Sequence, residues 1–106
     1  GRQVVPRAWI DSAWTPRTVS GFSGHAYGYG WWLRDARVGG ALAPADAPVA
    51  RLRFAWGYGG QFLFVVPELA LVVVATSDPD APERDRTHLT AIHTLVDEAI
   101  LPAVAR

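Results

Sequence analysis

The sequence predicts a single α+β domain, and two patterns carry this prediction. Residues 61–66 and 69–76 are almost wholly apolar and are separated only by Pro67 and Glu68, as in two antiparallel neighbouring strands joined by a tight turn. Apolar residues recur at spacings of three and four over residues 4–14 and 86–99, which predicts an amphipathic helix at each end. The 106 residues are enough for one domain with a modest core.

The predicted N-terminal helix has its apolar stripe on Trp9, Ile10, Ala13 and Trp14. Pro6 suits its first turn, and Pro16 is expected to end it. Two tryptophans on so short a helix need a surface to pack against.

Residues 25–34 predict a strand, because aromatic side chains alternate there with small ones. One face would carry Tyr27, Tyr29 and Trp31. The other face would carry Ala26, Gly28 and Gly30, so another element can approach it closely. Residues 35–50 contain paired glycines and two prolines without periodicity, which predicts a loop.

Residues 51–56 alternate between apolar and charged side chains, which predicts a half-buried strand. Leu52, Phe54 and Trp56 would face the core, with Arg51 and Arg53 on the other side. The strands at 61–66 and 69–76 are apolar on both faces, so we expect both faces to be covered and both strands to lie at the centre of the sheet.

The predicted C-terminal helix follows a charged surface loop at residues 78–86. Asp85 is the expected N-cap residue. Pro102 is expected to close the run. The stripe that would face the sheet comprises Leu89, Ile92, Leu95, Val96, Ala99 and Ile100.

Composition excludes several classes of function. The chain contains no cysteine, so thiolate metal sites, disulfides and a cysteine nucleophile are excluded. All ten basic residues are arginine, so no catalytic lysine is present. The formal net charge is zero and no basic stripe occurs, which argues against nucleic acid as a partner. The longest apolar run, residues 69–75, is too short for a transmembrane helix.

Two arrangements of polar residues could form a catalytic or a metal site. Residues 21–25 approach the pattern G-x-S-x-G, but His25 replaces the last glycine and a strand follows, so we interpret Ser23 as part of a turn. His88 and His93 are five residues apart and would lie on different helix faces, with Asp97 forming a surface pair with His93. No metal or cofactor site is therefore expected.

Two further features have a packing and a binding interpretation. The aromatic residues Tyr27, Tyr29, Trp31, Trp32 and Trp56 could form a carbohydrate-binding face, although core packing explains aromatics at this spacing. The glycines of residues 57–60 fit either a β-bulge or wide bend, or a strand edge whose N–H groups face a substrate. The residues alone do not decide between these two interpretations of the glycines.

Three stretches in order resemble the C-terminal part of the serine β-lactamase-like hydrolases. They are VVPRAWI at residues 4–10, YGYGWW at 27–32, and WGYGGQ at 56–61 leading to VPEL at 66–69. This family includes class C β-lactamases, DD-peptidases, esterases and 6-aminohexanoate-dimer hydrolases. The resemblance extends over nearly all of residues 1–106 and implies one incomplete domain, an antiparallel sheet with the terminal helices packed on one face.

The resemblance also implies a substrate edge at Gly57, Tyr58, Gly59, Gly60 and Gln61. Gly57-Tyr58-Gly59 takes the place of the family's K-T-G or H-x-G stretch, and the N–H of Gly60 or Gln61 would be an oxyanion donor. The S-x-x-K nucleophile and the tyrosine motif would lie upstream, so no catalytic residue is expected within the chain. Because no cation stands at Gly57, an ester or amide is favoured over a β-lactam.

The competing hypothesis is a non-catalytic binding domain that uses the aromatic strand and the exposed sheet edge. In either case a central strand without its neighbours is an association hazard, so a homo-oligomer through that edge is expected.

Overall fold

The computed structural model describes residues 1–80 and 86–105, and of Arg86 only the backbone. The expected N-cap, Asp85, lies outside the described residues. The elements in chain order are α1 (Arg7–Ala13), β1 (Thr18–Val19), β2 (Ala26–Tyr27), β3 (Trp32–Arg37), the short 3-10 turn η1 (Gly40–Leu42), β4 (Val49–Gly57), β5 (Gln61–Val66), the 3-10 turn η2 (Pro67–Leu69), β6 (Leu71–Ala75), α2 (Arg86–Leu95), the wide helical turn η3 (Val96–Ile100) and α3 (Leu101–Val104).

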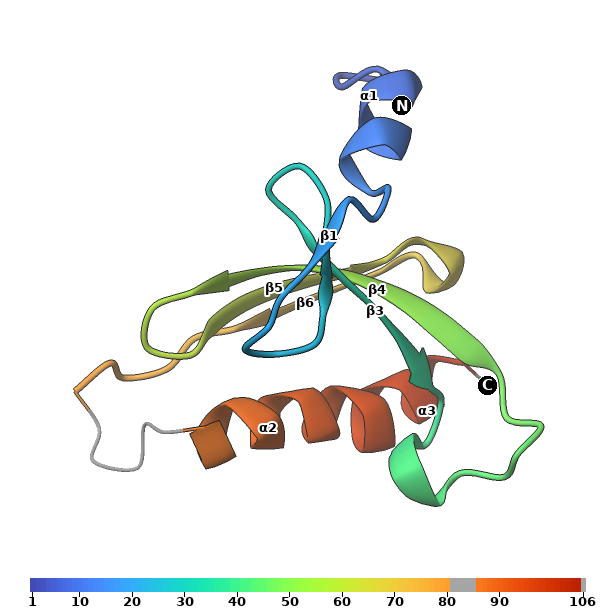
Figure 1. The fold of residues 1–106 in the computed structure, drawn as a ribbon. Helices are drawn as coiled ribbons and strands as arrows, with labels where there is room; N and C mark the ends of the chain where they lie inside the picture. The colour runs from blue at the N-terminus through green and yellow to red at the C-terminus, as the bar shows by residue number, and fades with distance from the viewer. Residues whose placement is uncertain (81–85, 106) are drawn as a thin grey trace.

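The sheet is a six-stranded antiparallel meander in which every strand pairs with the next one along the chain. The α+β class and the antiparallel pairing of β5 with β6 are confirmed, with Phe64 opposite Val73 in the register. The C-terminal helical run α2–η3–α3 extends along one face of the sheet (Figure 1). Within the described residues, no helix is both long and apolar enough to cross a membrane.

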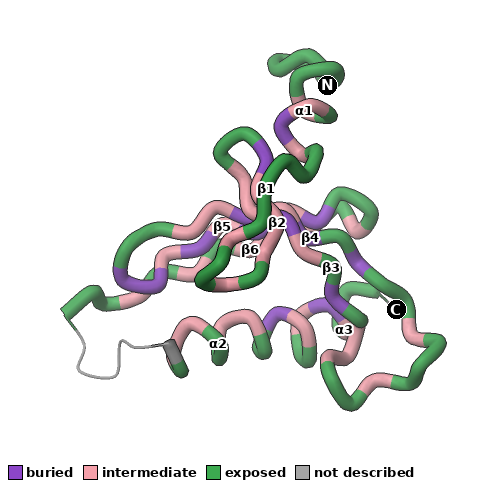
Figure 2. Tube along the Cα trace, viewed as in Figure 1, coloured by how far each residue is buried: buried purple, intermediate pink, exposed green. Residues whose placement is uncertain are grey.

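The core lies between β4, β5 and the C-terminal helices (Figure 2). The predicted alternation along β4 is confirmed, since Leu52 and Phe54 are buried while Arg51 is exposed. Its partner β5 contributes Phe62, Phe64 and Val66, and the helical run contributes Val96 and Leu101. Six of these side chains, all except Phe62, are fully buried. Together they form the contact that fixes the helix to the sheet.

The prediction that β5 and β6 are covered on both faces is wrong for this chain. Leu63 and Val65 are only half-buried, and Val72 and Val74 are 59% and 66% exposed. Strand β6 is an edge strand of the sheet. Apolar residues on both faces of these strands therefore did not mean that both faces are covered. Within the described residues, no helix covers the outer face of β5 and β6.

The strand predicted at residues 25–34 is two strands of a hairpin, because the chain turns between β2 and β3. The period-two aromatic pattern continues through the turn and so conceals it. Gly30 takes a positive φ of 78° there, which only glycine adopts without strain. A Cβ on Gly28 would overlap the carbonyl oxygen of Ala13, so the expected close approach is confirmed at Gly28, whereas a Cβ on Gly30 would meet nothing within 4 Å.

The N-terminal helix differs in position from what the resemblance implies. Helix α1 lies on the side of the sheet opposite to α2 and projects beyond it (Figure 1). Only its C-terminal end reaches the sheet region, where the Tyr29 N–H donates to the Ala13 carbonyl at 3.0 Å. The two tryptophans find their partners on the β2–β3 turn, Trp9 stacking on Tyr29 and Trp14 meeting Trp31 edge-on.

The sequence predicts that the C-terminal helix ends at Pro102, but the helix continues to Val104. Proline cannot donate to the carbonyl four residues earlier, and its ring crowds that carbonyl. The wide turn Val96–Ile100 comes immediately before α3 and loosens the helix at this point, so Pro102 fits near the start of α3.

Candidate functional site

The five residues predicted as a substrate edge form the turn between β4 and β5. Gly57 pairs with Gln61, and Tyr58, Gly59 and Gly60 connect them. Gly59 and Gly60 have φ angles of +85° and +84°, a region that favours glycine. The sequence therefore placed the bend correctly, and the structure makes it a tight hairpin at one end of the sheet.

Close packing accounts for two of the hairpin glycines. A Cβ on Gly59 would lie 2.7 Å from the Pro79 Cβ, and one on Gly60 would lie 3.1 Å from the His88 ring. Gly57 is different, because it is exposed and a Cβ there would make an ordinary 3.5 Å contact with the Gln61 side chain. Of the two interpretations of the glycines, packing thus explains Gly59 and Gly60 without a ligand.

A hydrogen-bonded clamp ties the hairpin to the chain after β6. The Gln61 amide donates through Nε2 to the Ser77 carbonyl at 2.6 Å, and its Oε1 accepts from the Ser77 N–H at 3.1 Å. The Ser77 hydroxyl lies 3.0 Å from both the Gly60 carbonyl oxygen and His88 Nε2. Sequence reasoning missed Ser77 and His88, because no local motif links them to the hairpin.

The clamp has a chemical consequence for Ser77. Its single hydroxyl proton can go to the Gly60 carbonyl or to His88 Nε2, but not to both. A donation to the carbonyl leaves no proton for His88 to remove. We therefore interpret Ser77 as a residue that holds the backbone of Gly60 and Gln61 in one geometry.

The turn that contains Ser23 joins β1 to β2, as expected for a Ser/Gly turn. The Ser20 hydroxyl accepts from the N–H groups of Phe22 and Ser23, and the Ser23 hydroxyl accepts from the His25 N–H at 3.3 Å. The His25 side chain leaves the turn and packs edge-on against Phe54 at a centroid distance of 5.4 Å.

A polar cluster lies between the sheet and α2, and its centre is Arg34 of β3. The guanidinium makes two hydrogen bonds to the Asp97 carboxylate, at 2.7 and 2.9 Å. Its Nε donates to His93 Nδ1 at 3.0 Å. The prediction of a surface pair between His93 and Asp97 is wrong, because both residues bind Arg34 instead.

These contacts determine the protonation of His93. Arginine remains protonated in proteins, so Nδ1 of His93 must be the acceptor and the ring proton sits on Nε2. The pKa of His93 is lowered from 6.5 to about 3 by burial first, then by the charges of Arg34 and His25. Burial and Arg34 also lower the pKa of His25, whose ring centroid lies 5.5 Å from that of His93.

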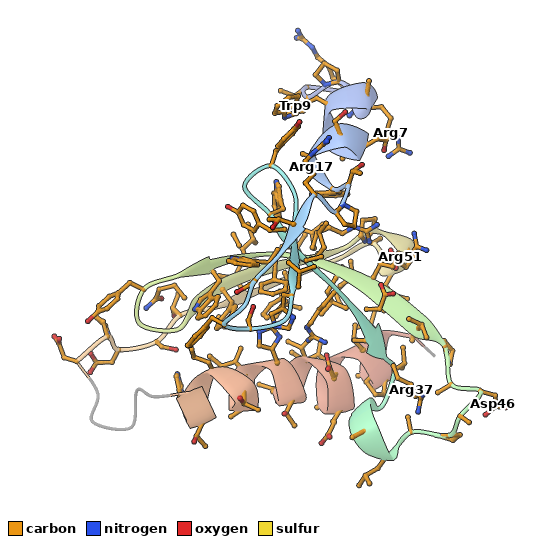
Figure 3. All side chains as sticks on the ribbon, in the orientation of Figure 1. Arg7, Trp9, Arg17, Arg37, Asp46 and Arg51 are labelled. Carbon is orange, nitrogen blue, oxygen red and sulfur yellow. The ribbon has the colours of Figure 1, made fainter. Side chains whose placement is uncertain are left out.

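A cavity of about 340 Å³ opens beside this cluster. Its polar residues are Ser23, His25, Arg34, Thr90 and His93, and its apolar residues are Phe22, Trp56, Phe62 and Leu89. Side chains crowd the space between the sheet and α2, whereas the labelled Arg37, Arg51 and Asp46 lie at the periphery (Figure 3). Within residues 1–80 and 86–105, no three His, Asp or Glu side chains gather as metal ligands would.

The aromatic residues weighed as a sugar-binding face pack largely against one another. Tyr27 meets Trp32 at a centroid distance of 4.4 Å, and Trp32 meets Trp56 at 6.1 Å. Tyr29 is stacked by Trp9 on one side and lies under the Arg17 guanidinium at 3.9 Å. Ring packing of this kind accounts for the two tyrosines and Trp32 without a ligand, whereas Trp56 also lines the cavity.

Comparison with family models, with curated proteins and with solved structures finds no match to this chain. The two candidate sites are therefore argued from their own geometry.

We expect the substitution Gly59→Ala to lower the free energy of unfolding by about 2 kcal/mol, because the positive φ and the contact with Pro79 both penalise a Cβ. Gly57→Ala is the matched control in the same hairpin, with an expected change below about 0.5 kcal/mol. Urea denaturation followed by circular dichroism measures both. Equal effects of the two substitutions would contradict the packing interpretation.

The lowered pKa of His93 predicts a loss of stability in mild acid. Between the unfolded-state pKa near 6.5 and the folded-state pKa near 3, the unfolded chain binds the extra proton, so stability falls as the pH falls through this window. Complete coupling would amount to about 2 kcal/mol at pH 5, and we expect about 1 kcal/mol because the ring is partly exposed.

The measurement is the free energy of unfolding at pH 7.5 and at pH 5, for the natural chain and for His93→Gln. The substituted chain should lose less stability over this interval. Thr94→Gln, on the exposed side of the same helix, should lose as much as the natural chain. An unchanged pH dependence in His93→Gln would exclude His93 as the source.

Proposed function

We propose that this chain is the C-terminal part of a serine hydrolase of the β-lactamase-like superfamily. The complete enzyme would cleave an ester or amide bond through an acyl-serine intermediate. The hairpin of Gly57, Tyr58, Gly59, Gly60 and Gln61 would form one wall of its active site. The serine nucleophile and its lysine would come from sequence upstream of Gly1, since no lysine occurs in the chain.

The hydrogen bonds that tie the hairpin to Ser77 are the observation that carries this proposal. An oxyanion donor works only if its N–H is held in place before charge develops on the substrate oxygen. The Gln61 side-chain amide forms hydrogen bonds with both the carbonyl and the N–H of Ser77. The Ser77 hydroxyl in turn contacts the Gly60 carbonyl. The N–H groups of Gly60 and Gln61 therefore belong to a backbone that has little freedom to move.

The substrate class follows from the charges near the hairpin. The family's usual cation is replaced by Gly57, so a substrate carboxylate would find no lysine there. An uncharged ester or amide, as in enzymes resembling the 6-aminohexanoate-dimer hydrolases, suits this edge better than a β-lactam. The competing binding-domain hypothesis gains less support, because the aromatic rings it would use are paired with one another.

The isolated 106 residues are expected to turn over neither nitrocefin nor p-nitrophenyl acetate above the buffer rate, because they hold no S-x-x-K motif. Addition of the polypeptide encoded upstream should restore hydrolysis of p-nitrophenyl acetate. Stopped-flow or plate absorbance measures both. Turnover by the isolated chain, or an upstream frame without S-x-x-K, would contradict the proposal.

In the restored enzyme, Gln61→Ala should lower kcat by roughly tenfold or more, because it releases the backbone that carries the oxyanion donor. Gln3→Ala is the control, since Gln3 is exposed and, among the described residues, bonds to the nearby Val5 carbonyl. An equal kcat in the two variants would remove the hairpin from the mechanism.

We also propose that the isolated chain self-associates through β6, whose Val72 and Val74 are exposed at the sheet edge. Val74→Lys should shift the equilibrium toward monomer, as measured by sedimentation equilibrium. Leu42→Lys is the control, because Leu42 is 94% exposed in η1, outside the sheet. A monodisperse monomer at high concentration of the natural chain would rule this out.

A further inference from the structure

The cavity between the sheet and α2 is separate from the hairpin site. None of the five hairpin residues lines it. Its volume of about 340 Å³ falls within the range of small-molecule sites, roughly 300–1,000 Å³. Phe22 and Thr90 are exposed at its rim, whereas Phe62 is buried in its wall. The cavity therefore has an outer side open to solvent and an inner side within the core.

The lining includes a hydrogen-bond donor whose tautomer is fixed by a contact within the protein. Because Arg34 Nε occupies His93 Nδ1, the proton of the neutral ring is on Nε2. No described residue accepts a hydrogen bond from this Nε2, and no polar side-chain atom among the described residues is both fully buried and unpartnered. The geometry thus assigns His93 Nε2–H as a donor to whatever enters the cavity.

The charges around the cavity select against an ionic ligand. Each of the three guanidinium nitrogens of Arg34 already donates a hydrogen bond within the protein, and Asp97 balances its charge. An anion would compete with Asp97 for the same cation. A cation would find no carboxylate among the described residues of the lining and would be repelled by Arg34. An uncharged molecule avoids both costs.

The apolar wall is a row of parallel rings. Trp56 and Phe62 are nearly parallel, with an interplanar angle of 6° and a centroid distance of 6.1 Å. Phe22 is also roughly parallel to Trp56, at a centroid distance of 6.4 Å and an interplanar angle of 25°. A wall of aromatic rings favours an aromatic body, which can pack against it through offset or edge-to-face contacts.

We propose that this cavity binds an uncharged, flat aromatic molecule that carries a hydrogen-bond-accepting oxygen. The oxygen accepts from His93 Nε2–H, and the ring system packs against Trp56 and Phe62. The inference does not depend on the proposed hydrolase function, because it uses other residues and requires no upstream sequence.

The test is a titration of the 106-residue chain with 2-acetylnaphthalene, followed by two-dimensional ¹H–¹⁵N NMR up to the solubility limit of the probe. We expect saturable shifts at the Trp56 indole and at the amides of Phe62 and His93. Two matched probes vary one property each. 2-Ethylnaphthalene lacks the oxygen and 2-naphthoate carries a negative charge, and each should bind roughly tenfold more weakly, as the loss of one good hydrogen bond or an added desolvation cost implies.

Two substitutions on α2 locate the site. Leu89→Trp fills the cavity and should abolish the shifts. Leu95→Trp introduces the same side chain at a residue that is 56% exposed, and it should leave binding unchanged. Phe22→Ala removes an exposed ring at the rim, and should weaken binding several-fold without disturbing the core.

Three results would overturn the proposal. They are the absence of saturable shifts with 2-acetylnaphthalene, equal affinity for 2-naphthoate, and undiminished binding by both Phe22→Ala and a folded Leu89→Trp. If Leu89→Trp fails to fold, the Phe22→Ala result and the probe series decide the question.

Discussion

The contact on which the structure depends is the one between Arg34 of β3 and the two side chains that face it from the C-terminal helical run. His93 and Asp97 are four residues apart, so they lie one turn above the other on the same helix face and meet one guanidinium. A partly buried ion pair contributes little net stability, but the loss of either partner leaves an unpaired charge in an apolar setting. A helix shifted along its axis by one residue would break all three hydrogen bonds. The pair therefore fixes the helix register, and with it the packing of Val96 and Leu101 on the sheet.

Residues of the same contact line the cavity and supply part of its polar side. A wholly apolar interface would close over Phe54, Phe62 and Phe64, whereas a guanidinium and two imidazoles need space and hydrogen-bond partners. The rings of these three phenylalanines meet His93 edge-on, at centroid distances of 5.1 to 5.3 Å, so the imidazole is enclosed by aromatic groups on several sides. This burial, together with the charges of Arg34 and His25, lowers the pKa of His93 to about 3. A neutral hydrogen-bond donor beside an arginine whose charge is balanced suits a ligand that is polar but uncharged.

Features that depend on neighbouring residues could be predicted from the sequence, and features that depend on distant pairs could not. The alternation of Leu52 and Phe54 with Arg51, and the positions of β5 and α2, follow from local periodicity. The β2–β3 turn was missed because its aromatic alternation runs through Gly28 and Gly30, which indicate a bare strand face as readily as a bend. Arg34 and Asp97 are 63 residues apart in sequence, and Gln61 and Ser77 are 16 apart. Each pair is brought together only by the docking of whole elements, so neither the polar cluster nor the hairpin clamp has a local signature.

The two proposed sites are linked through the strands that they share. Trp56 and Phe62 are cross-strand neighbours in the register of β4 and β5, one step from the pair Gly57 and Gln61 that closes the hairpin. A molecule stacked on these rings would therefore press on the residues that support the proposed oxyanion donor. The same hairpin is hydrogen-bonded to Ser77 and packs on His88 of α2, so the two candidate sites are connected through β4, β5 and the helix.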